Sequence, residues 1–207
     1  LESAVQGQQP VIFETRSEEE YLRGQILAED FGLDAWYRGN GQEYRIIDVL
    51  GENTEPLFVP LDFPDAPDVD NPEAAMNASL AELRHWYLAP TNAGQLADAG
   101  IDFAITSDGL TSVGDFLPNL RTAVARGLSP DDALAAITTT PARYLGIEGT
   151  HGTIAAGNVA NLVVAEGDLF TQEVDVRDVW VHGTVYGVTR AAQIDPRGTW
   201  VIQSEDQ

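Results

Sequence analysis

Charged side chains stand at the ends of predicted strands, where a parallel sheet would bring them together. Arg16 and Arg38 end two successive strand-like runs. Guanidinium groups on one edge of a sheet can bind an anionic substrate. They can equally pair with nearby carboxylates, here Glu14 and Glu43, and ion pairing is the interpretation that we favour.

Asp108 is a carboxylate with two interpretations. It lies in the sequence Ser107-Asp108-Gly109, directly after the strand-like run 101–106. Asp followed by Gly is typical of a turn, and the residues alone favour a turn. The second interpretation depends on a family resemblance that is described below.

Histidine and cysteine are scarce. The chain has no Cys, which excludes disulfides, zinc ribbons and thiol catalysis. Its three histidines, His85, His151 and His182, are widely separated in the sequence. We expect His182 at the exposed tip of a hairpin, because the pair His182-Gly183 stands between two apolar runs.

The composition bounds the class of protein. The chain has 207 residues, 43% of them hydrophobic, which predicts a sizeable core, and it has no apolar run long enough to span a membrane. The net charge of −22 argues against nucleic acids and anionic membranes as partners. All 11 basic residues are Arg, which fits either a protein kept soluble in high salt or a GC-rich genome. No signal peptide is recognisable at Leu1, and both the bacterial cytoplasm and the periplasm remain open.

Strand-like and helix-like segments alternate through residues 1–148, which predicts an α/β domain with a parallel sheet. From Gly149 onward, strands follow one another without helices, so residues 149–207 are expected to form a separate β-domain. Strands are expected at 10–15, 33–38, 56–61, 101–106, 152–154, 160–165 and 179–186. Helices are expected at 17–31, 42–50, 79–88, 90–99, 113–126, 129–136 and 140–145, and a long loop at 62–77.

Four segments resemble the amidohydrolase superfamily, and its imidazolonepropionase-like members in particular. Residues 134–146, LAAITTTPARYLG, resemble the "AL-T-NPA-LLG" helix of that family. Residues 152–164 resemble its "G-I--GK-ADLVV" segment, and residues 179–183 its "V-V-G" closing hairpin. Upstream, residues 104–108 resemble the end of the eighth strand of the family's barrel.

The resemblance implies the C-terminal half of a (β/α)₈ TIM-type barrel, strands five to eight, together with the C-terminal part of a composite β-sandwich. Four βα units cannot close such a barrel and leave two open sheet edges. The expected partners are therefore the missing N-terminal half of the barrel, with its His-x-His pair on strand one, or a second copy through self-association. A small-molecule substrate is expected if the barrel is active.

The resemblance also implies a site. Family members use a divalent metal such as Zn to hydrolyse non-peptide C–N bonds, in cyclic amides or small peptide-like substrates. Asp108 corresponds to the family's catalytic and metal-binding Asp, whereas Glu14 stands at the strand-five His position and Gly39 at the strand-six His position. None of the three histidines can replace these ligands. A rearranged oxygen-rich site would draw on the acidic side chains Asp108, Glu14, Glu43 and Asp62.

Two functions remain open. The chain is half of a metal-dependent hydrolase, or it belongs to a degenerate barrel that scaffolds or regulates an active amidohydrolase domain. Residues 14–19 and 60–64 resemble the ligand-poor barrel of tandem amidohydrolases from Bacteroidetes. Because two ligand positions hold Glu and Gly, we expect that this copy lacks the usual metal site and that no cofactor belongs to this chain alone.

Overall fold

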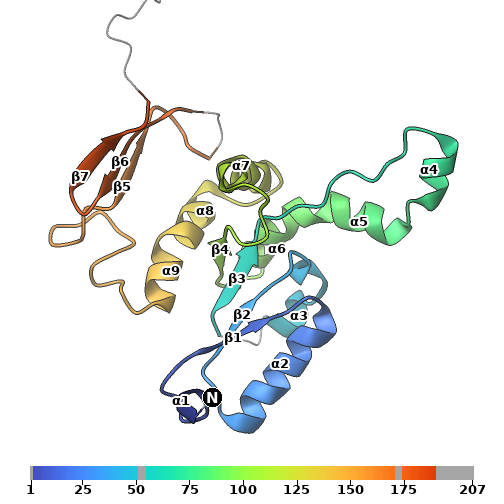
Figure 1. The fold of residues 1–207 in the computed structure, drawn as a ribbon, viewed down its shortest axis with the longest axis horizontal. Helices are drawn as coiled ribbons and strands as arrows, with labels where there is room; N and C mark the ends of the chain where they lie inside the picture. The colour runs from blue at the N-terminus through green and yellow to red at the C-terminus, as the bar shows by residue number, and fades with distance from the viewer. Residues whose placement is uncertain (1, 51–54, 171–173, 190–207) are drawn as a thin grey trace, which may run out of the picture.

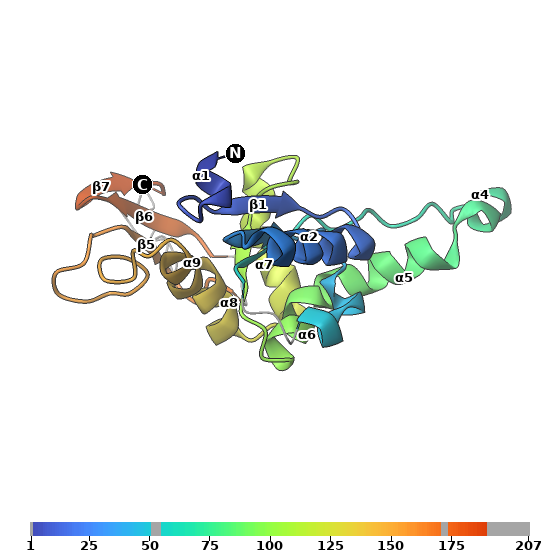
Figure 2. The same cartoon turned by 90° about the horizontal axis from the view of Figure 1, so that it is seen from below.

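A computed structural model describes residues 2–50, 55–170 and 174–189 of the chain (Figure 1). An α/β body occupies the centre of the molecule. A helical arm, residues 72–88, projects from one end, and a small antiparallel sheet lies at the other end (Figures 1 and 2). Within the described ranges, no helix has the length and apolar character needed to cross a membrane.

The body is built on a parallel sheet, as the alternation of segments predicts. Its strands are β1 (Val11–Glu14), β2 (Ala35–Arg38), β3 (Leu57–Pro60) and β4 (Ala104–Thr106), paired in the order β1-β2-β3-β4. All three pairings are parallel, so the carboxyl ends of the four strands meet at one edge. The α/β class is confirmed, and the sheet is consistent with part of a TIM-type barrel.

Helices connect the strands, and α2, α5, α8 and α9 begin within one residue of the predicted positions. The Ser17 side chain caps α2 by accepting a hydrogen bond from the Glu20 amide, and Ser129 caps α8 in the same way. The helices are α1 (Glu2–Val5), α2 (Glu18–Phe31), α3 (Ile47–Leu50), α4 (Pro72–Asn77), α5 (Leu80–Leu88), α6 (Asn92–Asp98), α7 (Phe116–Ala125), α8 (Pro130–Ile137) and α9 (Thr139–Tyr144). Short 3₁₀ turns are η1 (Glu43–Arg45), η2 (Ala89–Thr91) and η3 (Val113–Asp115).

Two predictions between β2 and α5 are wrong. The single helix expected at 42–50 is divided into η1 and α3, because Ile46 leaves the helical conformation with φ −125° and ψ 24°. The loop expected at 62–77 contains the helix α4. Asn71 caps that helix and Pro72 begins it, a pairing that suits a helix start.

The second sheet is antiparallel, with β5 (Leu162–Ala165), β6 (Val176–Val181) and β7 (Thr184–Gly187) in that order. The predicted hairpin at His182-Gly183 is confirmed, and both residues have positive φ, 49° and 80°. The strand expected at 152–154 is wrong. That segment forms a turn in which the Asn158 side chain donates to the Thr153 carbonyl oxygen, and Ile154 is 90% exposed.

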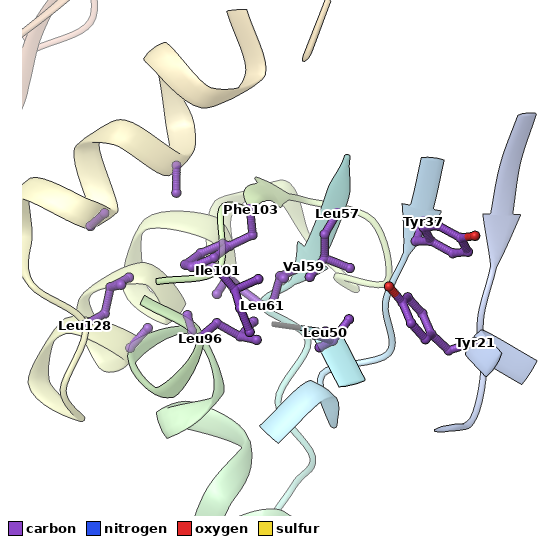
Figure 3. Packing of buried hydrophobic residues seen from close by; sticks show 14 of the residues in the cluster. Tyr21, Tyr37, Leu50, Leu57, Val59, Leu61, Leu96, Ile101, Phe103 and Leu128 are labelled. Carbon is purple, nitrogen blue, oxygen red and sulfur yellow. The ribbon is translucent and has the colours of Figure 1, made fainter. Parts of the chain in front are cut away.

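The hydrophobic core lies between the parallel sheet and the helices that cover one of its faces (Figure 3). Tyr37 on β2, Val59 on β3, Leu96 on α6 and Leu120 on α7 are almost fully buried. Tyr21 of α2 packs against the ring of Tyr37, with 4.7 Å between ring centroids. The buried side chains on the covered face therefore fix the register in which the strands pair.

The opposite face of the sheet is more open. Residues on this face alternate with the core residues, and Ile12, Trp36 and Phe58 are all at least partly exposed there. The rings of Trp36 and Phe58 lie 5.7 Å apart, and Tyr144 of α9 packs edge-on against Phe58. Glu14 and Arg38 stand on the same face at the carboxyl edge of the sheet, where the candidate site begins.

Candidate functional site

Arg38 lies between two carboxylates at the carboxyl edge of the parallel sheet. Its Nε is 2.5 Å from Asp108 Oδ2, and its Nη1 is 3.9 Å from Glu14 Oε2. The Arg38 side chain is 28% exposed, whereas those of Glu14 and Asp108 are 61% and 58% exposed. A half-buried cation thus joins a carboxylate from β1 to one from the turn that follows β4.

The backbone explains why these three side chains meet. Glu14 and Arg38 are register partners in the β1–β2 pair, so their side chains leave the sheet on the same face. Thr15 secures this end of the pair, because its amide and its hydroxyl both donate to the Arg38 carbonyl oxygen, at 3.0 and 2.8 Å. Asp108 reaches the site from the turn after β4.

Asp108 also performs the turn role that its sequence suggests. Its amide donates to Thr106 Oγ1, and its Oδ1 accepts a hydrogen bond from the Gly109 amide at 3.0 Å. That bond leaves Oδ2 directed toward Arg38. The turn interpretation of Asp108 is thus confirmed through Oδ1, whereas Oδ2 pairs with Arg38 and the catalytic interpretation stays a prediction.

Glu43 is the buried acid of the region, with only 4% of its surface exposed. Its Oε1 accepts hydrogen bonds from the amides of Asn40 and Gly41, at 2.6 and 3.1 Å, and its Oε2 accepts one from Asn92 Nδ2 at 2.5 Å. Burial raises the pKa of Glu43, and these hydrogen bonds oppose that rise. The carboxyl group is enclosed by donors from two segments of the chain.

Gly39 is required by the position of Glu43. A Cβ atom built at Gly39 would overlap Glu43 Oε1 and would lie 2.7 Å from its Cδ. Any side chain at Gly39 would have to displace a buried, hydrogen-bonded carboxylate. A side chain at this position and the observed placement of Glu43 therefore exclude one another.

The sequence analysis missed Asn92, which begins α6 and is 2% exposed. Its Oδ1 accepts a hydrogen bond from the Tyr44 amide at 2.7 Å while its Nδ2 holds Glu43. Asn92 is 49 residues from Glu43 in the chain, and no spacing in the sequence connects them.

The predicted ion pairing of the two arginines is correct only in part. Arg38 does pair with Glu14, but its second partner is Asp108, because Glu43 is turned toward Asn92. For Arg16, no ion pair is found within the described parts of the chain, and its amide donates to Glu20 instead.

Three further candidate residues, Asp62, His85 and His182, lie away from Arg38 or beside the turn that carries Asp108. Asp62 is exposed and its Cβ approaches Gly109, the neighbour of Asp108. His85 lies on α5 with its Nδ1 3.4 Å from the Tyr44 hydroxyl, and burial lowers its pKa. The exposed His182 lies in the turn between β6 and β7 of the antiparallel sheet, as predicted. A cavity of about 440 Å³ lies along the arm, lined by residues including Pro64, Asn77, Glu82 and His85.

These side chains do not fit a metal centre as they stand. Within the described ranges, no group of three or more His, Asp or Glu side chains is arranged to hold a metal ion. Arg38 occupies the space between Glu14 and Asp108, and Glu43 already accepts three hydrogen bonds. A metal would have to displace a guanidinium that carries a permanent positive charge.

The chain has relatives among known proteins. Residues 91–194 match the family described as "Amidohydrolase family". The adenine deaminase 2 of Jannaschia sp. (strain CCS1) is 35% identical over 112 residues, which cover 49% of this chain and 17% of that protein. The imidazolonepropionase of Paracidovorax citrulli (strain AAC00-1) is 38% identical over 87 residues, or 40% of this chain and 20% of that protein.

Solved structures share the fold over most of the chain. An amidohydrolase from Thermotoga maritima MSB8 superposes with a TM-score of 0.71 and 25% identity, over 92% of this chain and 46% of that one. A Xaa-Pro dipeptidase with bound methionine in its active site gives 0.63 and 18%, over 90% of this chain and 47% of that one. The chain therefore spans about half the length of these structures.

The family match includes β4, Asp108 and the helices α7 to α9, and the Thermotoga maritima structure shares the fold over 92% of the chain. Sequence and fold thus lead to the same conclusion by separate routes. This chain belongs to the amidohydrolase family.

Proposed function

We propose that the barrel to which this chain contributes does not perform metal-dependent hydrolysis at this site, and that it supports an active amidohydrolase domain as a non-catalytic scaffold. The family is generally metal-dependent, and membership by itself supports a hydrolase function. The proposal concerns what this copy of the site does, not which family it belongs to.

The observation that carries the proposal is the filled strand-six position. Gly39 offers no donor, and the carboxyl group of Glu43 takes up the space beside it. The hydrogen bonds from Asn40, Gly41 and Asn92 hold that carboxyl group in place. A site that has lost two imidazoles, and has filled the space of one, has little means to fix zinc in the geometry that hydrolysis needs.

A scaffold role requires an intact core, and the domain has one. The core beneath the sheet contains fully buried side chains from β3, α6 and α7. A barrel that keeps its core but changes its ligands retains the surfaces by which it can hold a second domain. The resemblance of residues 14–19 and 60–64 to the ligand-poor barrels of tandem amidohydrolases agrees with this role.

The second candidate is a hydrolase with an oxygen-rich site. One observation favours it: Asp62 approaches the turn that carries Asp108, so a third carboxylate lies near the pair of Glu14 and Asp108. Such a site would act on C–N bonds of cyclic amides or small peptide-like compounds once the other half of the barrel is in place.

The full-length protein that contains this chain can decide between the two candidates. Hydrolysis of a panel of cyclic amides and dipeptides is measured for the wild type and for Asp108→Asn. We expect equal rates, because any activity resides in another domain. A large loss of activity in Asp108→Asn would show that this site is catalytic.

A further inference from the structure

The helix α5 of the arm is covered on one side and exposed on the other. Glu82 and His85 are on the covered side, where they line the cavity beside the loop that runs alongside α5 (Figure 1). By helical spacing, Leu80, Leu83 and Tyr87 share the other side of the helix. Their exposed fractions are 63%, 36% and 60%. These three side chains form an apolar ridge that the described parts of the chain leave open to solvent.

Arginines flank this ridge. Arg84 belongs to α5 itself, and Arg126 follows the end of α7. The Arg126 guanidinium lies over the Tyr87 ring, 4.7 Å from its centroid, and donates to the Tyr87 carbonyl oxygen at 2.7 Å. Within the described ranges, neither arginine forms an ion pair. Glu82 is the acidic residue of α5, and on the covered side it accepts a hydrogen bond from the Ser79 amide at 2.8 Å.

This combination is unusual for so acidic a chain, which has 33 acidic and 11 basic residues. Arginines without carboxylate partners stand here beside exposed apolar side chains, and Trp86 next to them is 42% exposed. Trp, Tyr and Arg are the residue types that supply most of the binding energy in protein interfaces. An apolar surface flanked by cations is complementary to an apolar segment flanked by carboxylates.

We propose that the ridge is a docking site for an acidic amphipathic helix of a partner protein. The apolar side chains of that helix cover Leu80, Leu83 and Tyr87, and its carboxylates pair with Arg84 and Arg126. A helix that lays its apolar face on such a surface is a recurrent mode of recognition. The docking site goes beyond the proposed function, because it lies on α5 and does not depend on the chemistry at the carboxyl edge of the sheet.

Charge selects this occupant over the others. In a two-fold dimer of this chain through the ridge, each ridge would meet its own copy, so Arg84 and Arg126 of both copies would come together without carboxylates between them. Nucleic acids and anionic membranes are repelled by the net charge of −22. An acidic helix on the ridge is attracted by the two nearby arginines, while acidic residues more than about 8 Å away are screened at physiological salt.

A synthetic peptide tests the docking site on the full-length protein. The fluorescein-labelled probe is about 20 residues long, so that it forms a helix, with leucine along one face and glutamate beside it. Its affinity is measured by fluorescence polarisation for the wild type, Leu80→Ser and Arg84→Gln. The matched controls are Ile154→Ser, at an exposed turn, and Arg177→Gln, on the antiparallel sheet.

We expect the acidic probe to bind the wild type and both controls equally. Leu80→Ser should weaken binding about tenfold, because it removes apolar surface from the ridge. Arg84→Gln should weaken binding about fivefold, because it removes one of the two cations. A second probe with lysine in place of glutamate is attracted by the whole acidic molecule, so its affinity should be the same for the wild type and Leu80→Ser.

Three results would overturn the docking site. The first is no saturable binding of the acidic probe, or equal binding to the wild type, Leu80→Ser and Arg84→Gln. The second is a ridge that prefers the lysine probe, shown by loss of that probe's affinity in Leu80→Ser. The third is a wild-type dimer that Leu80→Ser dissociates in analytical ultracentrifugation, because a second copy would then cover the ridge. Should Leu80→Ser not fold, Arg84→Gln against Arg177→Gln decides the question.

Discussion

At the scale of single residues, the carboxyl edge of the sheet is organised by charge and by space. Arg38 forms ion pairs with Glu14 and Asp108, and the carboxyl group of Glu43 fills the space beside Gly39. Neither arrangement requires a bound ligand. The exposed carboxylates of Glu14 and Asp108 share the cation, while the buried carboxylate of Glu43 is held by neutral donors.

Gly39 and Glu43 should be energetically coupled. We expect Gly39→Ala to lower the free energy of unfolding by about 1 kcal/mol, because the new methyl group meets a carboxyl group that three hydrogen bonds hold in place. In the Glu43→Ala background the same change should cost less. Chemical denaturation of the four proteins measures the coupling, and an equal cost of Gly39→Ala in both backgrounds contradicts it.

His85 should make stability depend on pH. Burial, aided by the nearby Arg45, lowers the pKa of His85 in the folded protein, so the unfolded chain binds the proton more tightly. The stabilising contribution of neutral His85 is therefore complete above its unfolded pKa, about 6.5, and is lost as the pH falls below that value and through the lower pKa of the folded protein. The unfolding free energy of His85→Gln should change less between about pH 7.5 and 5 than that of the wild type. Parallel profiles for the two proteins would be the contrary result.

At the scale of elements, close backbone approaches fix how the helices meet beneath the site. Asn92 begins α6 and holds Glu43, so the placement of α6 determines the geometry of the buried acid. Two positions later, Gly94 is buried against the turn that joins α7 to α8. A Cβ atom at Gly94 would lie 2.8 Å from the carbonyl carbon of Gly127 and 2.9 Å from the amide of Leu128.

Gly94→Ala should therefore destabilise the protein by about 3 kcal/mol, because the obstacle is backbone and cannot rotate away. Gly149→Ala is the matched control, since an added methyl group there meets nothing within 4 Å and the residue needs no positive φ. Thermal unfolding of both variants provides the comparison. Equal melting temperatures for the two variants would refute the packing of α6 described here.

At the scale of the whole molecule, the parallel sheet has two open edges. Among its described strands, only β2 and β3 are paired with a strand on each side. Apolar side chains lie near its first edge: Ile12 of β1 is 60% exposed, and Ile26 and Phe31 of α2 are 58% and 59% exposed. Surfaces of this kind are covered in a completed barrel. The chain also spans about half the length of the solved structures that it resembles.

Residues 1–207 produced alone should therefore associate, either with themselves or with the other half of the barrel when it is supplied. Analytical ultracentrifugation over a range of concentrations measures this directly. A monodisperse monomer of 22.4 kDa that unfolds cooperatively is the result that this half-barrel interpretation forbids.

Local signals in the sequence were sufficient for much of this fold. Strand–helix alternation predicts the parallel sheet, Ser17 and Ser129 mark helix starts, and the hairpin at His182-Gly183 follows from turn chemistry. The sequence does not predict the division of residues 42–50, which occurs at Ile46, where the backbone leaves the helical conformation.

The candidate site was less predictable, because its defining contacts join distant segments. Asp108, Glu14 and Gly39 could be named from the family resemblance, but their surroundings could not. The pairing of Arg38 with Asp108 spans β2 to the turn after β4, and the contact of Asn92 with Glu43 spans 49 residues. Such contacts depend on strand order and helix placement, which no spacing in the chain encodes.

The central claim is that this edge of the sheet carries its own cation and binds no metal. The most direct test is elemental analysis of the full-length protein, purified without chelators, for the wild type and for Asp108→Ala. We predict the same number of divalent ions per chain in both, because any bound metal lies in another domain. A wild-type protein that carries about one more zinc or similar ion than Asp108→Ala would contradict the account and would make Asp108 a metal ligand.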